Sequence, residues 1–277
     1  MNTRVVLLGT GTPNAEPDRA GAATAIVSGD RAYLVDLGAG VVRRASAAFA
    51  AGIAQLAPGR LTRAFLTHLH SDHTVGLPDA LLTPWVLGRR TPLEVWGPPG
   101  TQKMAELIRA AYAEDIGVRT TGLERADPAG AGVVVHEVAP GVVHEDERVR
   151  VTAFEVEHGS WEHAYGYRFD AADRSIVVSG DTAPSESLVA AARGCDVLVH
   201  EVYCDATLQA QPAPRRTYHS SFHTSAAELG RLAQRIRPGQ LVLYHQLMWG
   251  CSPEQLVAEV KREFGGPVVF GRDLGVY

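Results

Sequence analysis

The chain has 277 residues, of which 45% are hydrophobic and 21% are charged. This composition is typical of a soluble globular protein and excludes a disordered chain, a collagen-like fibre and a coiled coil. The formal net charge of −5 argues against a strongly basic nucleic-acid binder. Histidine is the unusual count, at 11 residues, and it is a common metal ligand and an acid or base near neutral pH.

The first half of the chain alternates short apolar runs with helical segments. Strands are expected at residues 4–8, 23–28, 31–36, 63–67 and 93–96, and helices at 41–51, 78–87 and 101–113. Pro84 is expected to kink or end the second of these helices. Residues 114–132 are polar and poorly periodic, which predicts a loop.

A second series of strands and helices follows. Strands are expected at residues 133–138, 149–155, 165–169, 175–179, 197–201 and 241–244, and helices at 185–192 and 225–236. Ser225 and Glu228 form a capping-box pattern, and Ser252 followed by Pro253 opens a last helix. Because no linker-like tract separates the halves, residues 1–277 are predicted to form a single domain. In it, two similar halves pack sheet on sheet with helices outside.

The beginning of the chain carries no targeting pattern. The apolar run at residues 5–8 is broken by Gly9, so it is too short for a signal-peptide core or a membrane span. The three cysteines, Cys195, Cys204 and Cys251, lack a metal-binding spacing. We therefore expect a cytoplasmic protein with reduced thiols and no membrane partner.

The densest motif follows the strand at residues 63–67. Three imidazoles and one carboxylate, His68, His70, Asp72 and His73, lie within six residues. Residues spaced i and i+2 in an extended segment point to the same side, so His68 and His70 converge. Burying these groups without partners would be costly, whereas a transition metal accepts imidazole and carboxylate ligands. The motif therefore predicts a metal site.

The motif alone cannot supply two full ligand sets. His158, Asp181 and His245 each lie just beyond the carboxyl end of a predicted strand, where the loops of layered α/β folds carry their sites. A single histidine in such a place is often only a hydrogen-bonded structural residue. Together with the motif, however, these three residues are the candidates for the remaining ligands.

Taken together, these motifs resemble the metallo-β-lactamase-fold hydrolases and, within that superfamily, the ribonuclease Z group. The resemblance covers nearly the whole chain. It is carried by residues 8–13, 34–40, 68–73, 158, 166–168, 179–182, 200–201, 221–224 and 245. It implies an α/β fold, the four-layer αββα sandwich.

The resemblance also implies two metal ions, expected as Zn²⁺, with Mn²⁺ or Fe²⁺ as alternatives. One ion would be held by His68, His70 and His158, the other by Asp72, His73 and His245, and Asp181 would bridge both. Two metals that share a water lower its pKa, which yields a hydroxide nucleophile at neutral pH. Asp72 would assist this water while it ligates.

The leaving group needs a proton, and His223 is the candidate general acid. It precedes the Ser225 cap by two residues, so it lies near a helix N-terminus that favours an anionic substrate. Glu201 would hold the imidazole in the required tautomer and raise its pKa, although a carboxylate at a strand end can also be merely surface-exposed. His163, His200 and His219 have no assigned role.

One spacing departs from the tRNA-processing members of the group. Only 23 positions separate His158 from Asp181, too few for the protruding arm with which those members clamp tRNA. Residues 114–132 could form such an arm elsewhere in the chain, but their sequence gives little support for it. Together with the acidic net charge, the missing arm favours a small anionic ester over structured RNA as the partner. Because relatives dimerise, the resemblance also leaves a homodimer as one possibility.

Several aromatic and basic residues lie in or beside predicted loops. Trp85, Trp161, Tyr218 and Trp249 either line a pocket for an aryl or nucleoside group or pack as ordinary apolar residues. Arg215 and Arg216 either meet an anionic substrate or form a solvated pair.

The predicted function is therefore a dinuclear zinc hydrolase that cleaves phosphodiester bonds through a metal-bound hydroxide. An arylsulfatase-type hydrolase is the alternative within enzymes, because sulfate esters differ mainly in charge. A non-catalytic metal-binding protein of the same fold is the alternative of another class. A β-lactamase is disfavoured by the bridging Asp181, and a flavodiiron protein by His70 at a position where those proteins carry Glu.

Overall fold

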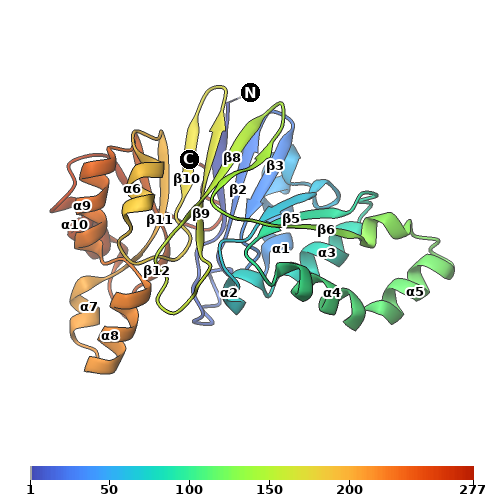
Figure 1. The fold of residues 1–277 in the computed structure, drawn as a ribbon, viewed down its shortest axis with the longest axis horizontal. Helices are drawn as coiled ribbons and strands as arrows, with labels where there is room; N and C mark the ends of the chain where they lie inside the picture. Colours follow the sequence, from blue (N-terminus) through green and yellow to red (C-terminus); the bar gives the residue numbers. More distant parts are fainter. Residues whose placement is uncertain (1) are drawn as a thin grey trace.

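Two β-sheets pack against each other, and helices cover the outer face of each sheet (Figure 1). We describe residues 2–277 from a computed structural model. The first sheet has six strands in the order β1-β2-β3-β4-β5-β6, and the second has seven in the order β13-β12-β11-β10-β9-β8-β7. The predicted α/β architecture with αββα layering is thereby confirmed.

The strands run along each sheet in chain order. The first sheet contains β1 (Arg4–Gly9), β2 (Ala23–Ser28), β3 (Arg31–Val35), β4 (Arg63–Phe65), β5 (Leu93–Gly97) and β6 (Val133–Glu137). The second contains β7 (Gly141–Glu145), β8 (Val149–Glu155), β9 (Tyr165–Ala171), β10 (Ser175–Val178), β11 (Val197–Tyr203), β12 (Gln240–Leu247) and β13 (Val268–Phe270). In each sheet the early strands pair antiparallel and the later ones parallel.

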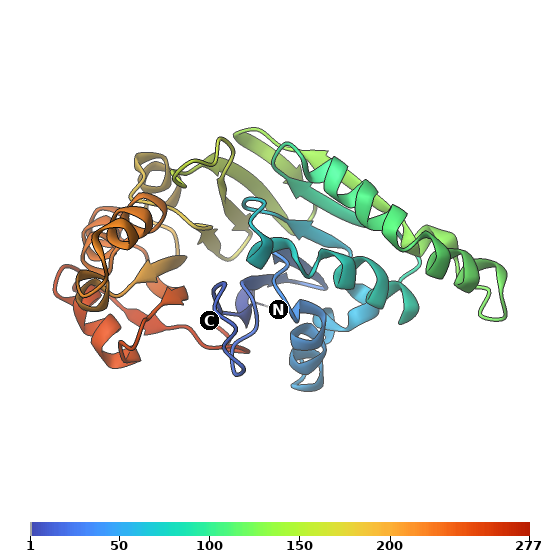
Figure 2. The ribbon, with the colours of Figure 1, turned by 90° about the horizontal axis from the view of Figure 1, so that it is seen from below.

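The helices divide between the two outer faces. The first sheet is accompanied by α1 (Val41–Ala50), α2 (Ser71–Thr74), α3 (Leu77–Val86), α4 (Thr101–Ala111) and α5 (Ala113–Thr121). The second is accompanied by α6 (Glu186–Ala192), α7 (Asp205–Gln209), α8 (Ala213–Phe222), α9 (Ala226–Ile236) and α10 (Pro253–Lys261). Figure 2 shows the helices of the two halves on opposite sides of the molecule, with the sheets between them.

Strands such as β1, β2, β11 and β12 are buried on both faces, which explains their continuous apolar runs. Along β1, Val5 and Leu7 pack between the two sheets, whereas Val6 and Leu8 pack beneath the helices of the first sheet. Successive strand residues point to opposite faces, so one apolar run serves two layers of the core. The loops at the carboxyl ends of the strands are left to carry polar groups.

Pro84 neither ends α3 nor leaves a carbonyl unpaired. The helix continues to Val86, although a proline cannot donate to the carbonyl four residues earlier, that of Ala80. The buried guanidinium of Arg89 takes over this role, because its Nη1 donates to Ala80 O at 2.9 Å. Of the two expected effects of Pro84, an end of the helix at this residue is not seen, since the side chain of Arg89, just beyond the helix, replaces the missing backbone donor.

The expected loop at residues 114–132 is also wrong. Helix α5 occupies Ala113–Thr121 and is followed by a short 3-10 turn at Pro128–Ala131. Helix α5 buries none of its residues and projects with the end of α4 away from the sheets (Figure 1). Without a buried face it has no apolar stripe, which is why periodicity did not predict it.

Helices α7 and α8 and strands β7 and β13 are further elements that were not predicted. Helix α8 illustrates the reason, because it also buries none of its residues. By contrast, the predicted capping box at α9 is confirmed: the Ser225 hydroxyl accepts from Glu228 N, and the Glu228 carboxylate accepts from Ser225 N. Within residues 2–277, no helix combines the length and the apolar character needed to cross a membrane.

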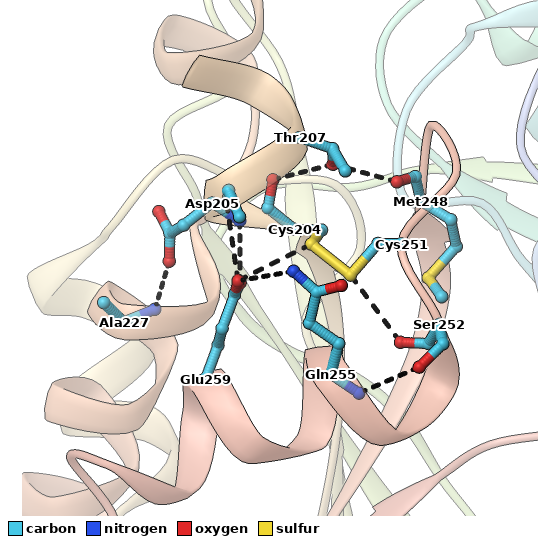
Figure 3. Close-up of a disulfide and its surroundings, with 10 residues drawn as sticks. Cys204, Asp205, Thr207, Ala227, Met248, Cys251, Ser252, Gln255 and Glu259 are labelled. Atoms are coloured by element: carbon cyan, nitrogen blue, oxygen red, sulfur yellow. Dashed lines mark hydrogen bonds between the residues drawn. A yellow bond between two sulfur atoms is a disulfide. The ribbon is translucent and has the colours of Figure 1, made fainter. Parts of the chain in front are cut away.

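Two of the three cysteines form a disulfide, so the expectation of reduced thiols is wrong for this pair (Figure 3). Cys204 follows β11 and Cys251 follows β12, and these strands are paired with Tyr203 opposite Leu247. The two cysteines are 47 positions apart in sequence, but both follow the carboxyl ends of neighbouring parallel strands. Cys195 is a buried free thiol. Strand pairing, which no local spacing reveals, brings Cys204 and Cys251 together.

Candidate metal centre

The predicted metal ligands meet where loops from both sheets converge. His68 and His70 follow β4, and Asp72 and His73 lie in the short helix α2. The other three come from the second sheet: His158 follows β8, Asp181 follows β10, and His245 lies in β12. All seven fall into overlapping groups whose possible ligand atoms lie within 4.8 Å of one another.

Three ring nitrogens form the first group. Nε2 of His68 lies 2.9 Å from Nδ1 of His70, and Nε2 of His158 lies 3.1 Å from the same atom. Hydrogen bonds orient the outer rings: Nδ1 of His158 donates to Phe222 O at 2.8 Å, and Nδ1 of His68 is 3.0 Å from Thr67 Oγ1. With the proton on Nδ1, each of these two rings directs its Nε2 lone pair into the group.

His70 is oriented from the other side. The indole N–H of Trp161 donates to His70 Nε2 at 2.7 Å, so His70 Nδ1 is the atom that faces His68 and His158. In this arrangement the proton of a neutral His70 lies on Nδ1. A cation that binds Nδ1 therefore requires the other tautomer of His70, with the proton on Nε2, and the bond from Trp161 would then be given up.

Carboxylates and imidazoles form the second group. Oδ2 of Asp72 lies 3.2 Å from His245 Nε2 and 3.4 Å from His73 Nε2. Oδ1 of Asp181 lies 3.4 Å from His73 Nε2 and 3.4 Å from His245 Nδ1. Asp181 belongs to two of the four ligand groups, one with His68 and His73 and one with His223 and His245. His68, His73 and His245 likewise belong to two groups each, so the four groups overlap in one cluster.

Asp36 contacts a candidate ligand and was not predicted as part of the site. It has a left-handed φ of 62° after β3, and its carboxylate accepts from Thr67 N at 2.8 Å and lies 2.8 Å from His73 Nδ1. The latter contact places the proton of His73 on Nδ1 and leaves Nε2 directed at the centre. The signal in the sequence was an aspartate directly after a predicted strand, but only the fold reveals that this aspartate contacts His73.

The donor set fits a cation. His73 Nε2, Asp181 Oδ1 and His245 Nδ1 are buried and have no hydrogen-bond partner among the described residues. Burial lowers the pKa of His68 well below its usual value and that of His158 to about 4, so both rings are neutral. Burial raises the pKa of Asp181, but His245 and His73 outweigh it and hold the pKa well below the usual value. Neutral imidazoles and ionised carboxylates are the forms that bind metals.

His223 and Glu201 lie beside this centre, as predicted. His223 Nδ1 is 3.4 Å from Glu201 Oε1 and 3.9 Å from Asp181 Oδ2. The same Glu201 oxygen accepts from Thr224 N at 2.9 Å and from Thr182 N at 3.2 Å, which fixes the carboxylate. Burial lowers the pKa of His223, but Glu201 more than offsets this and leaves it raised. The raised pKa favours a protonated imidazole at this position.

Comparison with known proteins agrees with this geometry. A family model described as "Beta-lactamase superfamily domain" matches residues 31–246. A protein named Ribonuclease Z from Mycobacterium bovis (strain BCG / Pasteur 1173P2) is 36% identical over 276 residues, covering 98% of this chain and 96% of that protein. The chain belongs to the ribonuclease Z family of the beta-lactamase superfamily.

Solved structures support the fold of this ribonuclease Z family member. The metallo-beta-lactamase fold protein YhfI from Bacillus subtilis has a TM-score of 0.76 at 19% identity, covering 99% of this chain and 98% of that one. The short form of human tRNase Z has a TM-score of 0.72 at 24% identity, with the same coverage of both chains. The predicted family and fold are confirmed, and the protein is a metal-dependent hydrolase of phosphoester bonds.

The segment between His158 and Asp181 is short, as its 23 positions predict. Between His158 and Asp181 this ribonuclease Z family member has only the paired strands β9 and β10 and their connections. The α4–α5 projection is the feature of the fold that extends outward instead (Figure 1). Residues 101–132, which contain it, carry four basic and five acidic side chains. The projection therefore lacks the positive excess that binds a nucleic-acid backbone.

The aromatic residues separate into two sets. Tyr218 and Trp249 line a cavity of about 330 Å³ at the metal centre, and Trp161 contacts His70. Trp85 is instead a buried residue of α3, and its indole N–H donates to Asp127 O. For Trp85 the alternative of ordinary apolar packing therefore holds, because the buried face of α3 carries the side chain into the interior.

The remaining predicted residues divide in the same way. Arg215 and His219 line the cavity, whereas Arg216 donates to Gln211 O and is not among the lining residues. His200 is buried within β11, with its Nδ1 2.6 Å from Glu201 O. Of the three histidines left without a role, only His219 thus reaches the cavity.

Proposed function

We propose that this protein is a dinuclear zinc phosphodiesterase that acts on small anionic esters. The observation that carries the proposal is the convergence of seven ligand side chains, several with buried unpartnered atoms, beside the His223–Glu201 pair. Because one apolar core contains residues of both sheets, we also infer that residues 1–277 form one domain. Mn²⁺ or Fe²⁺ would suit the same oxygen and nitrogen donors.

The ligands divide between two ions in this proposal. His68, His70 and His158 would hold the first ion. Asp72, His73 and His245 would hold the second, and Asp181 would bridge the two. When bound, such ions activate water as a nucleophile and neutralise charge on the phosphoryl group. Asp36 acts through His73 and is a positioning residue.

The chain's own groups handle the protons. Asp72 lies on the cavity wall with one oxygen near His245, and it would orient the attacking water as a hydrogen-bond acceptor. His223 lines the same cavity and would donate a proton to the departing ester oxygen. Glu201 keeps the imidazole charged until that step and holds it in place.

Two observations bear on substrate size. The balanced charge of residues 101–132 and the absence of an insertion between β9 and β10 favour a small ester over structured RNA. A second candidate is cleavage of RNA. It is favoured by full-length similarity to proteins named Ribonuclease Z.

Metal content and substrate choice test these assignments together. Metal-replete protein should contain two ions per chain and hydrolyse bis(p-nitrophenyl) phosphate faster than p-nitrophenyl sulfate or a precursor tRNA. His245→Ala should lose metal and activity, whereas His136→Gln, on an exposed histidine of β6, should retain both. Fewer than two ions would refute the dinuclear centre. Faster hydrolysis of the sulfate ester would indicate an arylsulfatase. Preferred cleavage of the precursor tRNA would indicate an RNA-processing enzyme, and no turnover despite full metal loading would indicate a binding protein.

A further inference from the structure

The cavity at the metal centre has a wall that the proposed chemistry does not use. Its lining includes Arg215, Tyr218, His219 and Trp249, which we call the aromatic wall. The first three come from α8, and Trp249 comes from the turn after β12. The same cavity is lined by Asp72, Asp181, His223 and His245. The aromatic wall therefore adjoins both the proposed ligands and the proposed proton donor.

The rings of the aromatic wall lie next to one another and lead toward His223, with His219 between Trp249 and His223. The rings of His219 and Trp249 lie 4.5 Å apart between centroids, and those of His219 and His223 lie 5.8 Å apart. The Arg215 guanidinium lies 5.7 Å from the centre of the Trp249 ring, a cation–π arrangement. A group leaving from the phosphoryl centre on the His223 side would thus meet Trp249 and His219.

Among the described residues, one group of the wall lacks a hydrogen-bond partner and another lacks an ion-pair partner. His219 Nδ1 is buried and has no hydrogen-bond partner among residues 2–277. Arg215 has no carboxylate in ion-pair range within the same residues, and Tyr218 is 48% exposed. A free ring nitrogen beside a partly exposed indole can bind a planar group through both stacking and a hydrogen bond.

Trp249 is held in place by the backbone on both sides. It has a left-handed φ of 45°, and the preceding Met248 carbonyl accepts from Thr207 Oγ1 at 2.9 Å and from Cys251 N at 2.9 Å. The Cys204–Cys251 disulfide attaches the same turn to the start of α7 (Figure 3). A turn held this way loses little backbone freedom when its tryptophan stacks on a ligand.

We infer that the aromatic wall is a specificity subsite that binds a planar aromatic ester group, with Trp249 as the stacking surface and His219 as the hydrogen-bonding partner. The inference rests on the proposed function, because it assumes that the phosphoryl group occupies the metal centre. Trp249 and His219 select the substrate without taking part in bond cleavage. The aromatic group is either an aryl ring or a nucleobase, and both offer the same flat surface.

Binding of non-hydrolysable ligands tests the subsite without turnover. Calorimetry on metal-loaded protein compares phenylphosphonate with cyclohexylphosphonate, which has the same head group and a saturated ring of similar size. We expect phenylphosphonate to bind roughly two- to tenfold more tightly, which is the range of aromatic pairing. Trp249→Ala should remove this preference, Trp249→Phe should keep most of it, and methylphosphonate should bind all three proteins equally.

Binding of adenosine 5′-phosphate tests whether the aromatic wall accepts a nucleobase or only an aryl ring. Its binding should weaken in Trp249→Ala if the wall accepts a nucleobase, and it should stay unchanged if the wall accepts only an aryl ester. Arg216→Ala serves as a control, because Arg216 neighbours the wall in sequence without lining the cavity. It should retain the full preference for phenylphosphonate.

Three results would overturn the inference: equal binding of the two ring phosphonates to the unsubstituted protein, a ring preference that survives in Trp249→Ala, or weakened methylphosphonate binding in that variant. The proposed function fails separately. A preserved ring preference without hydrolysis of bis(p-nitrophenyl) phosphate would refute the phosphodiesterase alone, whereas hydrolysis without a ring preference would refute the subsite alone.

Discussion

Glu201→Gln replaces a buried carboxylate with an amide of nearly the same shape, beside the proposed proton donor. Glu201 Oε1 lies 3.4 Å from His223 Nδ1, and the two side chains are 0% and 8% exposed, so solvent screens the pair weakly. At an effective dielectric constant of about 20, unit charges at this separation attract by ~5 kcal/mol. This is an upper bound, because the substitution also removes the cost of burying the carboxylate.

The sign of the pH effect follows from the two influences on His223. Burial lowers its pKa, and the Glu201 carboxylate raises it by more. Removing the carboxylate therefore lowers the pKa, and the imidazole loses its proton at a lower pH. The alkaline limb of the pH–rate profile should move to lower pH in Glu201→Gln. A lost general acid typically costs about 10²–10⁴ in rate, so we expect a loss of about 10²-fold at alkaline pH.

The assay compares two phosphodiesters with different leaving groups. A dinucleoside monophosphate has an alcohol leaving group that needs a proton, whereas bis(p-nitrophenyl) phosphate releases a stable phenolate that needs little help. The loss should be large for the first substrate and much smaller for the second. Glu259→Gln is the matched control, because Glu259 is equally a buried glutamate, placed near the disulfide (Figure 3). An unshifted alkaline limb, or equal losses on both substrates, would refute the assignment of His223 as the acid.

Three further predictions concern the centre and the thiols. Asp36→Asn should weaken metal binding by about 10–100-fold, because His73 loses its orienting carboxylate, and competition with a chelator measures this. Removing metal should lower Tm, since ligand at 100 times its Kd stabilises a protein by about 2.7 kcal/mol; an unchanged Tm on reloading with Zn²⁺ would contradict the site. In denaturant without reductant, only Cys195 should react with a thiol reagent, whereas three reactive thiols would exclude the Cys204–Cys251 disulfide.

The candidate metal ligands could be proposed from the sequence because they carry local signals. Three imidazoles and a carboxylate within residues 68–73 have few uses other than metal binding. His158 and Asp181 lie just past strands whose apolar runs are visible in the sequence. His245 was placed after a strand, and it lies instead within β12, which runs on to Leu247 past a register shift opposite Glu201 and Val202. The predicted end of the strand near which His245 lies was right, although the predicted last residue of the strand was not.

The sequence by itself predicted alternating strands and helices and a metal site at residues 68–73, because apolar periodicity and closely spaced ligand types are visible along the chain. The αββα layering and the division of ligands between two ions were expected from the family resemblance, and the role of His223 beside Glu201 stays a prediction. Only the tertiary structure decided that Asp36 orients His73, that Arg89 caps the carbonyl released by Pro84, and that Cys204 bonds to Cys251. The same holds for the aromatic wall, which joins α8 to the turn after β12. Such contacts depend on strand pairing and helix placement, and solvent-exposed helices such as α5 and α8 leave no apolar pattern from which to predict them.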